Sequence, residues 1–487
     1  MEEATSILLG FPPEADISND DFYDQAVNIH IKQVEHLLSA KKTTVSGEDA
    51  VKILKLLDPA VHSISYLAIL DSLSTYDGLS HEDRGRALID FFLNFDPRQI
   101  RYVGSMFSLG LNRISTDSFP LPHDVKVSLI AGAILKIDPT GSMLTSHHLA
   151  LVNLAYETDT AEYAFDVLDK QIVYFPGMSR NQGDKYKCDM SLPPTDYITP
   201  ETGLTTRLDI QPTLEYDLLS GLLYCSRAQW AKACAAFERV ITHPTRDGGV
   251  STIMTDAYNK WLLVNLLVNG HTPEMPTHIG TAAKKAYETL SKPYAAVASH
   301  FDAMAALPLK EEVERQGETW SNDQNTGLVQ QVLAAHQKWQ IMDLRNVYSK
   351  VAIADIRQTT CSAETGDALP SDEEVEKLIQ GMIVSGMLKG MIEKPADKPP
   401  YLTFLSESEE LSESEYKHHI ASAVQTLTEL EAMYKTTNAR LSTNPYWIKH
   451  LIREQKREKE NAGQEPPTFD DQIEDEDLMS GVTTGRL

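Results

Sequence analysis

The chain has 487 residues, in which 44 Lys and Arg stand against 70 Asp and Glu, for a formal net charge of -26. This length usually exceeds what a single hydrophobic core supports, so we expect two structured regions with flanking tails. The negative charge repels phosphate backbones and anionic bilayers, which disfavours nucleic acid and membranes as partners.

The cysteines and the amino terminus indicate a protein of the cell interior. The four cysteines show no C-x-x-C spacing, which is typical of reduced thiols; they are Cys188, Cys225, Cys234 and Cys361. The amino terminus opens with Glu2 and Glu3, whereas a signal peptide begins with basic residues. The most apolar stretch, around residues 261–268, is too short to span a bilayer. We expect a soluble protein of the cytoplasm and nucleus.

Residues 21–310, which follow an expected tail at residues 1–20, show the apolar spacing of successive helices. Ile53, Leu56 and Leu57 form one apolar stripe, and a second stripe follows after a break. Each break pairs a polar residue with proline, at Asp58-Pro59, Asp96-Pro97, Asp138-Pro139 and His243-Pro244. Short helix pairs cannot bury an apolar face alone, so we predict a right-handed solenoid of helical repeats.

The best repeat unit lies between residues 216 and 270. Small and large side chains alternate there as in a tetratricopeptide (TPR) hairpin, at Gly221, Tyr224, Trp230, Ala233, Phe237 and Ile241. Its two cysteines, Cys225 and Cys234, are expected to pack as small apolar residues. An insertion at residues 177–212, rich in Pro, Gly, Asp and Thr, is predicted to be a mobile loop.

Residues 311–410 have the pattern of a winged-helix domain. A helix from Gly327 leads into apolar residues that continue to Ile356 with the spacing of one helical face. Ser371 and Glu374 form a capping box for a second helix, which stops at Gly386. Two short strands follow, over residues 387–392 and 401–405, and form a small β-wing.

Residues 411–445 are predicted to form one long helix. Its apolar residues have heptad-like spacing, at Ile420, Ala423, Leu427, Leu430, Tyr434 and Leu441. The stripe is about 30 Å long at the α-helical rise and implies a partner helix. Residues 446–487 are charged and then acidic, and we expect a disordered tail.

Helical hairpins followed by a winged helix and a terminal helix resemble the PCI-domain proteins of the proteasome lid, the COP (constitutive photomorphogenesis) signalosome and translation initiation factor three. The segment 319–333, TWSNDQNTGLVQQVL, resembles the D-x-N-x-G-L-V-x-Q run of the signalosome subunit 3 family. The matching residues are Asp323, Asn325, Gly327, Leu328, Val329 and Gln331. Lys292-Pro293 and Asn444-Pro445 also fit this family.

The resemblance implies a non-catalytic scaffold in the complex that removes the ubiquitin-like modifier NEDD from cullin-RING ubiquitin ligases. Its partners would be other PCI subunits and the zinc isopeptidase subunit, whose H-x-H fingerprint is absent from this sequence. Two alternatives stay open: a PCI scaffold of the proteasome lid, and a nucleic-acid-binding PCI protein of messenger RNA export.

We expect no catalytic, cofactor or metal site. The adjacent pairs His147-His148 and His418-His419 point to different faces of a helix and are expected to be surface or cap residues. The candidate partner-binding residues lie on the wing and on the long helix instead. They are Met387, Met391, Tyr401, Leu402, Phe404, Ile420, Leu427, Leu430, Tyr434 and Leu441. Acidic residues at the start of the second helix, from Asp372 to Glu376, argue against DNA recognition.

Overall fold

The computed structural model describes residues 2–13, 19–39, 47–74, 81–116, 121–176, 186–244, 249–395, 399–405, 413–442, 447–453 and 456. They are mainly helical and fall into two compact units, Met1–Phe404 and Leu405–Leu487. No helix among these residues is long and apolar enough to cross a bilayer. Of the disordered tail expected at residues 446–487, residues 447–453 and 456 are described and helical; the rest lies outside the described residues.

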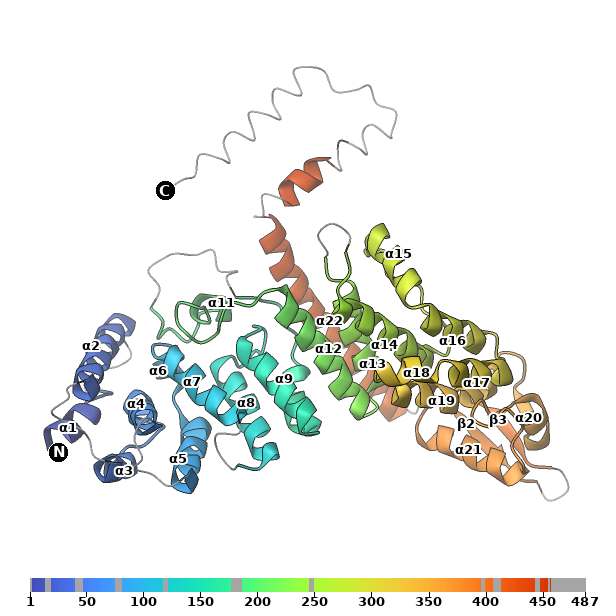
Figure 1. The fold of residues 1–487 in the computed structure, drawn as a ribbon, viewed down its shortest axis with the longest axis horizontal. Helices are drawn as coiled ribbons and strands as arrows, with labels where there is room; N and C mark the ends of the chain where they lie inside the picture. The colour runs from blue at the N-terminus through green and yellow to red at the C-terminus, as the bar shows by residue number, and fades with distance from the viewer. Residues whose placement is uncertain are drawn as a thin grey trace, which may run out of the picture. The chain divides into compact units, whose positions relative to one another are not determined.

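In the described part of the chain, nineteen helical segments precede the winged helix, and several neighbours in sequence, such as α12, α13 and α14, pack against each other (Figure 1). They are α1 Glu2–Leu8, α2 Asp20–Ser39, α3 Gly47–Leu56, α4 Ser63–Ser74, α5 His81–Asn94, α6 Pro97–Ile100, α7 Gly104–Ser115, α8 His123–Ile137, α9 Ser146–Glu157, η1 Ala161–Ala164, α10 Phe165–Leu168, α11 Pro194–Tyr197, α12 Ile210–Ser226, α13 Trp230–Ile241, α14 Thr252–Asn269, α15 Thr281–Leu290, α16 Lys292–Asp302, α17 Ala306–Arg315 and α18 Gly317–Asn322.

The predicted breaks fall between these helices. Asp58-Pro59 separates α3 from α4, and His243-Pro244 follows α13. Asp96 caps α6, where its Oδ1 accepts a hydrogen bond of 2.9 Å from the Arg98 amide, and Pro97 occupies the first turn. Proline suits that position because its missing N–H has no partner there in any helix.

The TPR-like hairpin consists of α12 and α13. Gly221 on α12 lies directly against the Phe237 ring on α13, and a Cβ at position 221 would overlap that ring. The small-then-large pattern in the sequence therefore marks a true close approach of two helices. Cys225 and Cys234 pack against the same core, and burial raises the pKa of the Cys225 thiol to about 12.

Residues 2–13 belong to the core, which corrects the expectation of a tail at residues 1–20. Helix α1 packs on α2, and Leu8 and Phe11 are completely or almost completely buried. Ser65 of α4 donates a hydrogen bond of 2.8 Å to the Leu8 carbonyl. The sequence contained this signal in Ile7, Leu8 and Phe11, but the run is too short to show a helical period.

Most of the insertion predicted as a mobile loop is ordered. Residues 186–209, which we call the strap, contact α2 and the helices from α6 to α9, and bury Cys188, Tyr197 and Leu204. Residues 177–185 lie outside the described residues. Pro212 lies within α12. At Gly203, which has a φ of +77°, the strap approaches α7 so closely that a Cβ would meet Ser105. Turn-forming composition alone does not show whether a loop is held down by contacts with distant residues.

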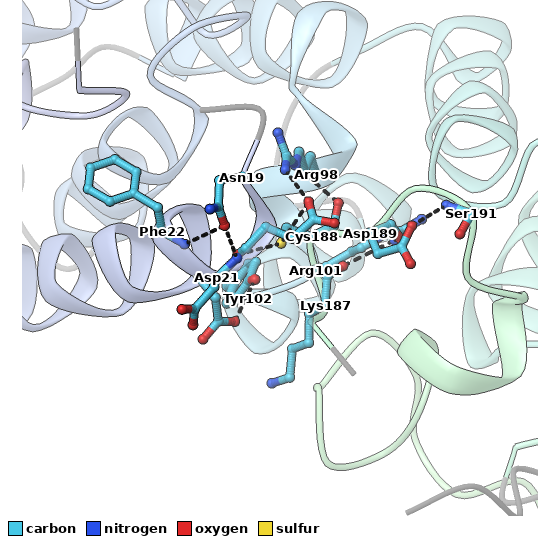
Figure 2. Close-up of polar contacts among 12 residues, drawn as sticks. Asn19, Asp21, Phe22, Arg98, Arg101, Tyr102, Lys187, Cys188, Asp189 and Ser191 are labelled. Carbon is cyan, nitrogen blue, oxygen red and sulfur yellow. Dashed lines mark hydrogen bonds and ion pairs between the residues drawn. The ribbon is translucent and has the colours of Figure 1, made fainter. Parts of the chain in front are cut away.

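Arg98 and Arg101 hold the start of the strap (Figure 2). Arg101 Nη1 donates to the carbonyls of Lys187 at 3.1 Å and Asp189 at 2.6 Å, and its guanidinium lies 3.5 Å from the centre of the Tyr197 ring. Arg98 Nε donates to the Cys188 carbonyl at 3.0 Å, while Arg98 Nη2 forms an ion pair with Asp20 at 2.8 Å. The two arginines therefore tie α2, α6 and the strap together.

The second part of the first unit has the order of a winged helix. It consists of α19 Thr326–Leu344, β1 Lys350–Ala352, α20 Ile353–Thr359, α21 Asp372–Val384, β2 Gly390–Glu393 and β3 Tyr401–Phe404. The prediction of a single helical face that continues to Ile356 was wrong, since α19 ends at Leu344 and β1 follows. Residues 350–352 pair with β3, and a strand of three residues is too short to reveal its period.

The D-x-N-x-G-L-V run forms the turn that starts α19. Tyr294 Oη of α16 donates a 2.7 Å hydrogen bond to Asp323, and the side-chain Nδ2 of Asn325 donates one of 2.7 Å to Tyr294 Oη. Asn325 is fully buried and directly precedes α19. The residues that carry the family resemblance therefore fix how α19 leaves the last helical repeat.

The expectation that His147 and His148 are surface residues was wrong, because both are buried at the start of α9. His148 does act as a cap: its Nδ1 accepts a 3.2 Å hydrogen bond from the Thr145 amide. Burial lowers the pKa of His147 to about 4 and that of His148 to about 3. His418 and His419 are exposed, as expected.

Arg101→Ala should loosen the strap. It removes a buried guanidinium that donates to two strap carbonyls and stacks on Tyr197, so we expect the free energy of unfolding to fall by about 3 kcal/mol. Proteases should then cut within residues 186–209. Thermal unfolding and limited proteolysis of the purified chain measure both effects. Arg207→Ala, at an exposed arginine of the same segment, is the control and should change neither.

His148→Gln should reduce the acid sensitivity of the fold. Between pH 6.5 and about pH 3, His148 is protonated in the unfolded chain but neutral in the folded chain, because its pKa is lowered to about 3 there. The free energy of unfolding therefore falls with decreasing pH, by about 1.4 kcal/mol per pH unit for such a group. Glutamine keeps the capping hydrogen bond and does not titrate. Thermal unfolding between pH 7 and pH 4 tests this; the exposed His419→Gln should leave the pH profile of the parent unchanged.

Candidate protein interface

The three strands of the winged helix form one antiparallel sheet in the order β1-β3-β2. The pairing joins Val351 to Leu402 in one pair of strands and Ile392 to Leu402 in the other. β3, which the sequence predicted as a wing strand, is therefore the central strand. The sheet edges belong to β1 and β2, so only these strands can pair with a strand from another chain.

Leu402 and Phe404 point into the domain, which corrects their prediction as partner contacts. Leu402 is fully buried and Phe404 nearly so, in a small core with Val351 and Ile392 beside them. Alternate residues of a strand face opposite sides, so Tyr401 and Thr403 lie on the outer face. A charge at position 402 or 404 would disrupt this core and could not report on an interface.

A glutamate of β2, on the outer face of the sheet, accepts hydrogen bonds from the other two strands. Glu393 of β2 accepts from Tyr401 Oη at 2.6 Å, from Thr403 Oγ1 at 2.7 Å and from Lys350 Nζ at 3.2 Å. These hydrogen bonds, that from Tyr401 first, lower the pKa of Glu393 to about 2. The carboxylate thus stays ionised and keeps the side chains of this face in fixed positions.

The predicted methionines lie near the β2 edge. Met391 is on the outer face beside Thr403, with half its surface exposed, whereas Met387 is partly buried against the domain core. Backbone groups of successive residues face opposite sides of a strand. Those of Met391 and Glu393 face β3, so those of Gly390 and Ile392 face away from β3. This edge offers one apolar side chain and two free backbone positions.

The β1 edge carries apolar residues that the sequence assigned to a helical face. Val347 and Tyr348, immediately before β1, are 73% and 50% exposed. The Phe404 amide donates to the Ser349 carbonyl at 2.9 Å, and the Ile353 amide to the Pro400 carbonyl at 3.0 Å. Alternation then leaves the backbone groups of Lys350 and Ala352 facing away from the sheet. An exposed apolar pair next to an unpaired edge is typical of an interaction site.

The acidic first turn of α21 is partly paired within the domain. Asp372 forms an ion pair with Arg357 at 2.9 Å, and Glu376 with Lys394. Ser371 caps the helix, as predicted, by accepting a 3.3 Å hydrogen bond from the Glu374 amide. A DNA-reading winged helix presents arginine and lysine at this place, whereas this turn presents carboxylates to solvent.

The long helix predicted at residues 411–445 is present as α22, Glu413–Ser442. Ile420 and Leu430 are about half exposed, Leu427 and Tyr434 about two thirds, and Leu441 is of intermediate exposure. Tyr416 and Val424, which the heptad pattern passed over, extend the exposed apolar surface. Nothing in the described part of its own unit covers this stripe.

In the part of the chain that the structure describes, no three His, Cys, Asp or Glu side chains are placed to share a metal ion. Apart from Glu393, the groups with strongly shifted pKa values are mainly buried side chains of the helical repeats.

Comparison with known proteins gives one consistent result. The family described as COP9 signalosome complex subunit 3, N-terminal helical repeats, matches residues 22–282. A protein of Neurospora crassa named COP9 signalosome complex subunit 3 is 41% identical over 500 residues, which covers 99% of each chain. A protein of the same name from Emericella nidulans is 28% identical over 382 residues, 76% of each chain.

Proposed function

Because the chain belongs to the COP9 signalosome complex subunit 3 family, we propose that it is a non-catalytic scaffold, which holds other subunits in place while one of them carries out the isopeptidase reaction. The membership confirms the resemblance that residues 319–333 suggested. The proposed task of the whole complex is removal of the modifier NEDD from cullin-RING ubiquitin ligases, in the cytoplasm and nucleus.

The observation that carries this proposal is the exposed apolar stripe of α22. Burying one large apolar side chain stabilises an association by about 1.5–3 kcal/mol, and the stripe offers several at coiled-coil spacing. A charged helix with one apolar seam is typical of a bundle with helices of other chains. We assign Ile420, Leu427, Leu430, Tyr434 and Leu441 to this contact with the terminal helices of other PCI subunits.

The two sheet edges support contacts with two different neighbours. A scaffold inside an array uses different surfaces toward the subunit on each side, so its interfaces are heterologous. We assign the β1 edge, with Val347 and Tyr348, to addition of a strand from one neighbour. We assign the β2 edge, with Met387 and Met391, to the other neighbour. Tyr401, on the outer face between the two edges, would contact the neighbours there.

The two alternatives have less support. A proteasome-lid scaffold would share the architecture but not the family that matches this chain. A nucleic-acid-binding PCI protein would need a basic α21, and the first turn of α21 carries Asp372, Glu373 and Glu374.

Leu427→Glu combined with Leu430→Glu should release the chain from its complex. Two buried charges in a helical bundle would cost at least about 3 kcal/mol of association free energy, while an exposed helix tolerates them. Purification through a tag on this chain, followed by native mass spectrometry, measures retained partners. Ser422→Glu with Gln425→Glu adds the same charge to another face of α22 and should retain them. If the two double variants behave alike, the stripe is not the contact.

Ala352→Pro should block the β1 edge without damaging the domain. Ala352 has a φ of -68°, which proline adopts, and its N–H faces away from β3. The free energy of unfolding should stay unchanged or rise by about 0.5 kcal/mol. Loss of one backbone donor and the bulk of the ring should weaken association with one neighbour about tenfold or more.

Ala352→Val, which keeps the N–H, is the matched control for the proline variant. Dissociation of the purified complex under dilution, followed by native mass spectrometry, compares the two. Equal stability of both complexes would rule out strand addition at β1.

A further inference from the structure

A groove lies on the helical side of the winged helix. It has a volume of about 510 Å³, opens to solvent, and runs between α19 and α21. Leu369, Leu378 and Met382 form its apolar part. Ala334 of α19 and Gly381 of α21 are small residues on its walls. This place is distinct from both sheet edges, which belong to β1 and β2.

Four charged residues line the groove without an internal partner. Lys338 and Lys377 and the acids Glu364 and Glu374 all line it. Among the described residues, none of these four side chains forms an ion pair, in contrast to Asp372 and Glu376 on the same helix. Charges of both signs around an apolar floor are typical of the rim of a protein interface.

Gly381 is not required by the packing of this chain. It lies in the middle of α21, where glycine destabilises a helix relative to alanine, and a Cβ added there would meet no atom within 4 Å. One turn later, Val384 is 79% exposed. A glycine that leaves space on the wall of a groove allows another backbone to approach α21 closely.

We propose that this groove is an interaction surface for an amphipathic α-helix of another subunit of the complex. Two helical walls with small residues at Ala334 and Gly381 accept a third helix, whereas an added strand would need the sheet edges. The bound helix places a small residue against Gly381 and apolar residues over Leu378 and Met382. Carboxylates on it pair with Lys338 and Lys377, and a basic residue pairs with Glu364 or Glu374.

A photocrosslinking amino acid in place of Ser385, on the groove rim, tests this directly. The complex is assembled in cells, irradiated, purified through a tag on this chain, and its crosslinked peptides are identified by mass spectrometry. The expected product joins position 385 to a helical segment of another subunit that carries acidic residues next to an apolar face. The same amino acid in place of Lys284, an exposed residue of α15, gives the background.

Two variants then probe the chemistry of the contact. Lys338→Glu with Lys377→Glu, and separately Gly381→Leu, should each lower the yield of that crosslink at least about tenfold. Lys284→Glu with Lys285→Glu changes the charge equally on the exposed face of α15 and should leave the yield unchanged. Gly132→Leu is the matched control for Gly381→Leu, since Gly132 is also exposed, helical and without a neighbour within 4 Å. The midpoint of thermal unfolding of the purified chain should not fall for Gly381→Leu.

The outcomes separate this inference from the scaffold function, on which it rests. A chain that purifies without other subunits contradicts the scaffold function itself. An intact complex in which position 385 reacts only within this chain, with a strand or loop of a neighbour, with nucleic acid, or with nothing, overturns the helix in the groove. An unchanged crosslink in the glutamate and leucine variants overturns it as well.

Discussion

The helices of the first unit have apolar faces that neighbouring parts of the chain must cover, and this requirement organises the molecule. Stacked hairpins such as α12 and α13 cover one another, but stacking always leaves two ends. At the amino-terminal end the chain covers itself, with α1 on α2 and with the strap fastened by Arg98 and Arg101. At the carboxyl end a winged helix with its own small core follows the last repeat.

Helix α19 belongs to both cores and links them. Val329 and Val332 lie in the core of the repeats, while Ile341, two to three turns later, lies in the core of the winged helix. Gly270, in a left-handed turn after α14, brings the chain so close to Trp339 that any Cβ would overlap the indole. The turn at Asp323 and Asn325 sets where α19 begins. One continuous helix therefore joins the core of the repeats to the core of the winged helix.

The parts of the fold that the sequence predicted are those whose signal is local and long. The capped start of α21 at Ser371, the hairpin around Gly221 and the 30 residues of α22 each repeat one period or contain a recognisable cap. The strap, α1 and β1 depend on residues far away in the sequence, such as Arg101 for the strap and β3 for β1. The same limit explains Leu402 and Phe404: strand alternation predicted two faces, but only the sheet order shows which face is buried.

The strongly shifted pKa values in the repeats reflect burial, whereas the exposed apolar residues of the carboxyl end point to contacts with other chains. Burial is the largest cause of both the lowered pKa of His148 and the raised pKa of Cys225, ahead of any charged neighbour. Such shifts report packing density, since a functional site combines burial with a specific partner. Val347, Val384 and the α22 stripe are exposed, although each exposed apolar side chain forgoes stabilisation that burial would give. Those residues lie on a sheet edge, a helix wall and a heptad seam, which are three geometries to which helices and strands of other chains can attach.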